Sequence, residues 1–131
     1  MDVFDVLDPL VAQRLRDSAV GPFAQAYSDR LCEQGYAAST VRVYVNCLSH
    51  FAWWAARRRF ELAELEDYVG RFVDQHLPRC RCAGRVQRVR HTVRAALEHL
   101  KTVVVTAGVQ LKTAPPSPAD QQLRRFDQYL D

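Results

Sequence analysis

QGYAASTVRVYVNCLSHFAWWAARRR, residues 34–59, decides the fold class of this chain. Apolar side chains recur at intervals of three and four residues, which is the spacing of one face of an α-helix. The pattern predicts one long amphipathic helix with its apolar side in a core. That side reads Val41, Tyr44 or Val45, Leu48, Phe51 or Ala52, and Ala55.

The opposite side of the same helix is polar. Ser39 is a favourable N-cap residue, so we expect the helix to begin there. Three consecutive arginines follow the helix at 57–59. A face of this kind needs either solvent or an anionic partner. The residues of this polar side are Arg42, Asn46, Ser49 or His50, Trp53 and Arg57.

Three other long segments also show helical spacing, and strand patterns are nearly absent. They are residues 22–35, ending at Gly35, residues 61–78, ending at Pro78, and residues 85–108, ending at Gly108. We therefore predict an all-α bundle of four main helices. The expected inward residues are Phe23, Ala26 or Tyr27, Leu31 and Cys32; Leu65, Tyr68 or Val69, Phe72, Val73 and Leu77; and Val86, Val89, Val93, Ala96 or Leu97, Leu100 and Val104.

Prolines and glycines divide the chain. Residues 1–20 are expected to form a short N-terminal helix or arm, and residues 21–111 the helical domain. Residues 112–120 read as a proline-rich linker, and residues 121–131 as the start of a further helix whose partner lies beyond this chain.

Composition indicates a soluble globular chain. Of its 131 residues, 48% are hydrophobic and 25% charged, and no apolar run approaches a membrane span. The N-terminus is acidic and lacks the basic start of a signal peptide, so we expect a cytoplasmic protein. The same location favours reduced thiols over a disulfide framework for the four cysteines.

Positive charge is unevenly distributed along the chain. The formal net charge is only +3, but residues 79–94 contain six arginines and no carboxylate. A basic block of this size indicates solvent or a polyanion opposite it.

A family resemblance rests on six positions, of which Thr40, Tyr44, Phe51 and Trp54 share one helical phase; the six are Gly35, Thr40, Tyr44, Leu48, Phe51 and Trp54. With them, about residues 23–111 resemble the N-terminal, SAM-like core-binding domain of tyrosine recombinases, the phage-integrase superfamily. The resemblance implies a module that clamps double-stranded DNA during site-specific recombination, integration or transposition. It also implies partners in the recombinase catalytic domain or in other protomers.

Arginine and helix-start groups are the expected phosphate contacts, since guanidinium binds phosphate bidentately and helix N-termini bind anions. Base reading in the major groove would fall to Arg42, Asn46 or His50. The rival hypothesis is a helical protein-interaction module in which Trp53 and the arginines bind an acidic partner. The expected DNA-binding residues are Ser39, Thr40, Arg42, Asn46, His50, Arg57, Arg58, Arg85, Arg88, Arg90 and Arg94.

The catalytic residues of a recombinase are not expected here. His91 and Arg94 have the family's His-x-x-Arg spacing and Tyr129 follows them, but no earlier arginine stands in the family's first catalytic box. Tyr129 also follows the proline-rich linker. We therefore predict a chain that is not an enzyme by itself.

His76, Cys80 and Cys82 raise the question of a metal site, with His91 as a candidate fourth ligand. Cys-x-Cys is not the usual Cys-x-x-Cys spacing, and a second cysteine pair is missing from the sequence. We therefore expect reduced, metal-free thiols and no cofactor.

Overall fold

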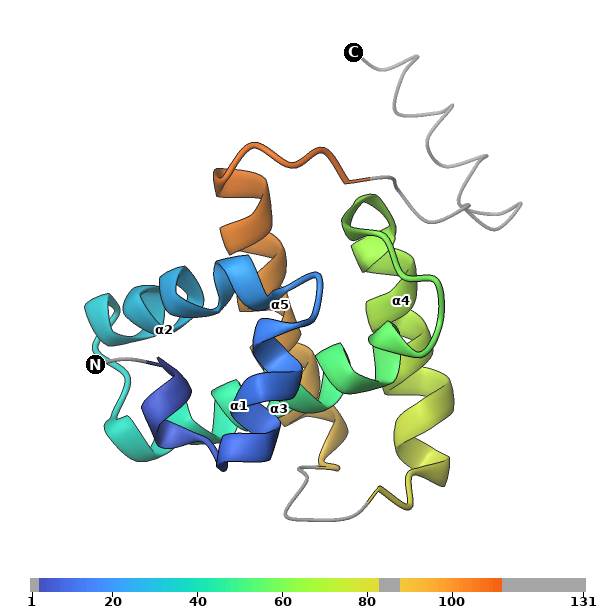
Figure 1. Ribbon diagram of the computed structural model, residues 1–131, viewed down its shortest axis with the longest axis horizontal. Coiled ribbons are helices and arrows are strands. Elements are labelled where there is room, and N and C mark those ends of the chain that lie inside the picture. The colour runs from blue at the N-terminus through green and yellow to red at the C-terminus, as the bar shows by residue number, and fades with distance from the viewer. Residues whose placement is uncertain (1–2, 83–87, 112–131) are drawn as a thin grey trace, which may run out of the picture.

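The computed structural model describes residues 3–82 and 88–111, in which helices are the only regular secondary structure (Figure 1). The prediction of an all-α chain is confirmed for these residues. The predicted linker and the helix start at 121–131 lie outside them. The α-helices are α1 (Pro9–Arg16), α2 (Ala24–Glu33), α3 (Ala38–Ala56), α4 (Leu65–Arg71) and α5 (Arg90–Thr106).

Short helical turns precede or connect these elements. Four are 3-10 turns, at Val3–Val6, Gly21–Phe23, Leu62–Glu64 and Leu77–Arg79, and η4 (Phe72–His76) is a π-helical turn that continues α4. The described helices include none with the length and apolar character needed to cross a membrane.

α3 lies at the centre of the fold, packed against α1, α2 and α5. In Figure 1, α4 and α5 stand upright and α2 lies horizontally on the α5 side of the molecule; α5 contacts both α2 and α4. The predicted apolar side of α3 is confirmed, since Val41, Val45, Leu48 and Phe51 are all fully buried. Each such side chain contributes about 1.5–3 kcal/mol by leaving water.

Most of the other predicted inward residues are also buried, but Phe23, Cys32, Tyr44 and Val89 are not, and Val86 lies outside the described residues. Tyr27, rather than Ala26, faces the core, where its hydroxyl donates a 2.8 Å hydrogen bond to the carbonyl of Ala96. Cys32, in the last turn of α2, and Val89, the N-cap residue of α5, are both exposed. Tyr44 is only half-buried.

The start of α3 differs from its prediction. Ala37, not Ser39, is the N-cap residue, with extended backbone angles (φ −61°, ψ 150°) and no side-chain hydrogen bond to the helix. The amide of Val41 donates to the carbonyl of Ala37, so Ser39 already lies within the first turn. Gly35, just before this start, has a positive φ of 84°, as expected for a residue that ends α2.

The predicted third helix is divided by the π turn η4. Phe72, the first residue of that turn, is fully buried and packs against α3. Its ring lies 5.4 Å from Phe51 and 5.2 Å from Trp54, measured between ring centroids. Phe60 and Tyr68 extend this aromatic cluster. The cluster joins the second half of α3 to α4 and η4.

Candidate functional site

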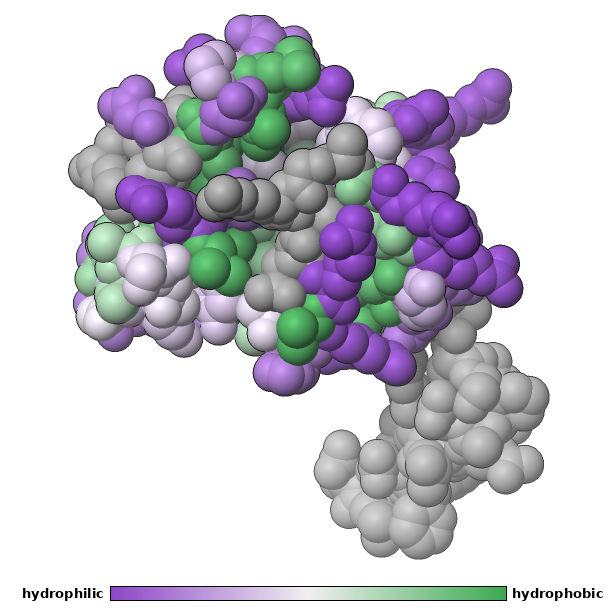
Figure 2. Space-filling model, turned by 90° about the horizontal axis from the view of Figure 1, so that it is seen from below, coloured by the Kyte–Doolittle hydropathy of each residue, from purple (hydrophilic) through white to green (hydrophobic). Residues whose placement is uncertain are grey.

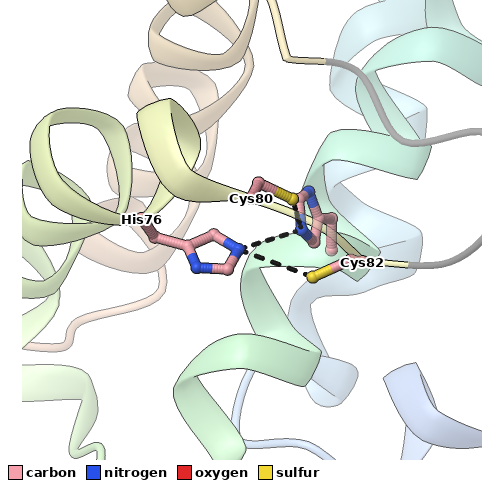
Figure 3. Close-up of side chains that lie close together, drawn as sticks. His76, Cys80 and Cys82 are labelled. Atoms are coloured by element: carbon pink, nitrogen blue, oxygen red, sulfur yellow. Dashed lines mark hydrogen bonds between the residues drawn. The ribbon is translucent and has the colours of Figure 1, made fainter.

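Two histidines and two cysteines converge where α3 meets the end of η4 (Figure 3). Nε2 of His76 lies 3.3 Å from Nε2 of His50. Sγ of Cys80 lies 3.6 Å from Nε2 of His50, and Sγ of Cys82 lies 3.6 Å from Nε2 of His76. All four potential ligand atoms lie within 4.8 Å of one another. We call these residues the His/Cys cluster.

The aromatic cluster fixes both imidazole rings. His50 meets Phe72 edge to face at 4.9 Å, and His76 stacks on the same ring at 5.2 Å. His76 is the last residue of η4, and π turns occur frequently at functional sites. Phe72 therefore orients the two histidines although they come from different elements.

The placement of the two thiols depends on an extended backbone at Cys80. Cys80 has φ −67° and ψ 127°, and its amide donates to the carbonyl of Leu77. In an extended segment, residues two apart point to the same side. The Cys-x-Cys spacing, which looked unfavourable for a metal site, thus brings both thiols to the same place.

Burial keeps the imidazoles neutral. It lowers the pKa of His50 to about 4, with help from His76 and Arg88. Burial also lowers the pKa of His76, with further lowering by the charges of Arg58 and Arg88. A neutral imidazole keeps a lone pair for a metal ion or a hydrogen-bond donor.

The two thiols affect each other. Burial alone would raise the pKa of the Cys80 thiol, but hydrogen bonds from Cys82 and from the Arg88 guanidinium lower it overall. Burial raises the pKa of Cys82, and the neighbouring Cys80 raises it further. Cys80 is therefore the thiol that ionises first.

An open groove of about 600 Å³ lies beside the His/Cys cluster. The described residues that line it include no acidic side chain; they are Trp53, Trp54, Arg57, Arg58, His76, Arg81 and Cys82. We call it the basic groove. Hydrophilic side chains also predominate on the face shown in Figure 2, with smaller hydrophobic patches between them.

Tryptophan rings hold two of the groove's arginines. The guanidinium of Arg58 lies 4.3 Å from the ring centroid of Trp54 and also donates a 2.9 Å hydrogen bond to the carbonyl of that residue. The guanidinium of Arg57 lies 5.0 Å from the ring of Trp53. These contacts limit the rotamers of both side chains and leave them exposed at the groove.

The predicted DNA-binding arginines are distributed over several places. Arg57 and Arg58 line the basic groove, and Arg88 lies at its cysteine side, where it donates to the carbonyl of Cys82. Arg90 and Arg94 share Asp74 instead, Arg94 at 3.8 Å, so that carboxylate offsets part of their charge. Arg85 lies outside the described residues.

Ser39, Thr40, Arg42 and Asn46 lie at the other end of α3. Ser39 and Arg42 are exposed, whereas Thr40 and Asn46 are half-buried. The amide of Asn46 donates to the carbonyl of Arg42 in its own helix, 2.9 Å away. These four residues thus remain near the surface.

The expectation that His50 lies on the outer face of α3 is wrong. His50 is only 6% exposed, because His76 at the end of η4 and Cys80 lie against it, and Ser49 is also buried. A buried ring cannot reach bases in a major groove. His91, the fourth ligand considered from the sequence, is exposed and outside the cluster, and His50 takes its place.

No protein family, curated protein or solved structure matches this chain.

Proposed function

We propose that this chain binds the phosphate backbone of duplex DNA with its basic groove. The observation that carries the proposal is the convergence of Arg57, Arg58 and Arg81 in a groove whose described lining includes no carboxylate. Guanidinium groups bind phosphate oxygens bidentately, and such contacts supply most of the affinity of non-specific DNA binding.

The tryptophans favour this function over a merely solvated surface. Arg57 and Arg58 are held against Trp53 and Trp54, so their side chains give up less freedom when they bind a phosphate. Arg81 comes from a different segment and lines the same groove. Arginines from two segments can contact phosphates that are not adjacent along one strand.

The surface proposed for DNA also includes the start of α3. Arg42 is exposed there, and Ser39 and Thr40 lie in the first turn, where amide groups favour anions. Fifteen residues separate Arg42 from Arg57 in the sequence, which corresponds to about 22 Å along a helix. A duplex that spans this distance across the surface would contact residues at both ends of α3, with base reading left to Arg42 and Asn46.

The family resemblance suggests the biological setting, a core-binding module of a site-specific tyrosine recombinase with a SAM-like fold. Leu48, Phe51 and Trp54, three of the residues that carry the resemblance, are buried, as a core motif requires. In this setting the chain acts on DNA in the cytoplasm, is not catalytic by itself, and works with a catalytic domain or other protomers.

Salt dependence of duplex binding tests the proposal. We expect the affinity of the full chain for a fluorescently labelled duplex, measured by anisotropy, to fall steeply as salt increases. The double variant Arg57→Ala/Arg81→Ala should flatten the logarithmic slope by roughly 1.8, at about 0.9 for each phosphate that is no longer neutralised. Circular dichroism should show unchanged helix content.

Lys101→Ala is the matched control. It removes the same kind of charge from α5, where Lys101 pairs with Glu98 and does not line the groove. We expect its slope to equal that of the parent protein. Absence of salt-dependent binding, or an unchanged slope in the double variant, would contradict the proposal and favour an acidic protein partner for Trp53 and the arginines.

A further inference from the structure

We propose that His50, His76, Cys80 and Cys82 form a closed, structural site for one zinc ion. The proposal is independent of DNA binding, since it rests on the His/Cys cluster and not on the charge of the groove. It also replaces the sequence-based expectation of metal-free thiols.

The distances between the ligand atoms fit a tetrahedral zinc ion. With Zn–N bonds of about 2.05 Å and Zn–S bonds of about 2.3 Å, a tetrahedron has N–N edges of about 3.3 Å and N–S edges of about 3.6 Å. The His50–His76 separation is 3.3 Å, and the Cys80–His50 and Cys82–His76 separations are both 3.6 Å. The remaining three pairs lie within the 4.8 Å that encloses the whole set. The four atoms therefore need little movement to surround an ion.

The donor atoms favour zinc among the common metal ions. Two thiolates and two imidazoles are soft and borderline ligands, which suit Zn²⁺ and not Mg²⁺ or Ca²⁺. Two thiolates also cancel the charge of the dication, so the bound site is neutral. Four protein ligands leave no coordination position for a substrate, which is the arrangement of structural zinc sites and not of catalytic ones.

The fold holds the ligands in position before any ion binds. Phe72 contacts both imidazole rings, and the rings of Trp54 and His76 lie 5.8 Å apart, measured between centroids. The extended backbone at Cys80 directs both thiols to the same side. A site assembled in this way gives up little conformational entropy on binding.

A hydrogen-bonded cluster without metal explains the geometry less well. In such a cluster one imidazole Nε2 would donate to the other, but 3.3 Å is beyond the usual range for a hydrogen bond from nitrogen. Thiols are also weak donors and weak acceptors, so they would add little to such a cluster. A zinc ion satisfies all four groups at once.

Zinc would fasten the cysteine segment to the core. His50 belongs to α3 and His76 ends η4, whereas Cys80 and Cys82 lie on the segment that leads toward α5. Arg81 stands between the two cysteines and lines the basic groove. The ion would thus fix the position of this arginine as well as the packing of the segment.

Metal content of the full chain, purified without an affinity tag from zinc-supplemented cells, tests the proposal. Native mass spectrometry and elemental analysis should give one zinc per chain. The variant Cys80→Ser/Cys82→Ser should lose it, as should His76→Gln. Cobalt should replace zinc and give the intense visible bands of a tetrahedral site together with thiolate charge-transfer absorption.

Matched controls come from the same chain. Cys32→Ser and His91→Gln change an exposed cysteine and an exposed histidine outside the cluster, and both variants should keep one zinc. If the cysteine variant does not fold, the cobalt spectrum of the unmodified chain still decides the question. A folded parent protein without stoichiometric zinc, a cobalt spectrum without thiolate bands, or full zinc retention in the folded cysteine variant would overturn the proposal.

Discussion

The two halves of α3 share an amphipathic sequence pattern but lie in different surroundings. In the first half, Ala38–Asn46, exposed residues alternate with buried ones, as a surface helix requires. In the second half, Cys47–Ala56, Trp53 is half-buried and only Ala56 is exposed. The second half is covered on its polar side as well, because His76 and Cys80 lie against His50 and Arg14 of α1 lies over Trp53.

This difference shows that polar residues of one helix face need not share a role. Arg42 and Asn46 stay near the solvent. His50, four residues after Asn46 on the same helix, belongs to a buried cluster instead. The boundary between the two halves is therefore a boundary between surface chemistry and interior chemistry.

The largest expected effect contrasts the aromatic residues of the two halves. Phe51→Ala should lower the free energy of unfolding by about 3–5 kcal/mol, because the ring is fully buried. Tyr44→Ala should cost clearly less, since Tyr44 is half-buried against Tyr36 and His99. Urea denaturation followed by circular dichroism measures both, and equal losses would show that the first half is as deeply packed as the second.

A smaller effect concerns the start of the first half. Ala37→Ser should stabilise the protein by about 1 kcal/mol, because Ala37 has N-cap geometry without a capping side chain. Ser39→Ala should change stability by less than about 0.5 kcal/mol, as is usual for an exposed residue without such a role. The same denaturation experiment applies. A loss of about 1 kcal/mol in Ser39→Ala would place the cap where the sequence suggested.

The smallest effect compares the DNA contacts of the two halves. Arg57→Ala and Arg42→Ala should each flatten the logarithmic salt slope by about 0.9, which is roughly a threefold difference in relative affinity between 50 and 200 mM salt. In a double variant the two changes should add. Anisotropy with a labelled duplex measures them.

Different results for the two arginines would locate the duplex. An unchanged slope for Arg42→Ala beside a flattened one for Arg57→Ala would confine DNA to the basic groove. The reverse result would remove the groove from the proposed surface and leave the start of α3.

The sequence was sufficient for the features that depend on neighbours along the chain. Helical spacing identified the buried residues Val41, Leu48, Phe51 and Phe72, because each helix turns its apolar side toward a core whatever the partner. Gly35 and Gly108 marked helix ends, since both have positive φ, which glycine adopts without strain.

The cap of α3 marks the limit of such local reasoning. Ser39 has a suitable side chain, but the helix begins at Ala38, because the Ala37 carbonyl accepts from the Val41 amide. Propensity for a cap is worth only about 1 kcal/mol, which tertiary packing of the chain can outweigh.

Only the tertiary structure could assemble the His/Cys cluster. The sequence was reason to consider His76, Cys80 and Cys82 together, with His91 as a candidate fourth ligand. His91 is exposed at the start of α5, while His50 lies 26 residues before His76 and contacts it. Such a contact depends on how η4 packs across α3 through Phe72, and helical periodicity carries no information about which segment covers a polar face.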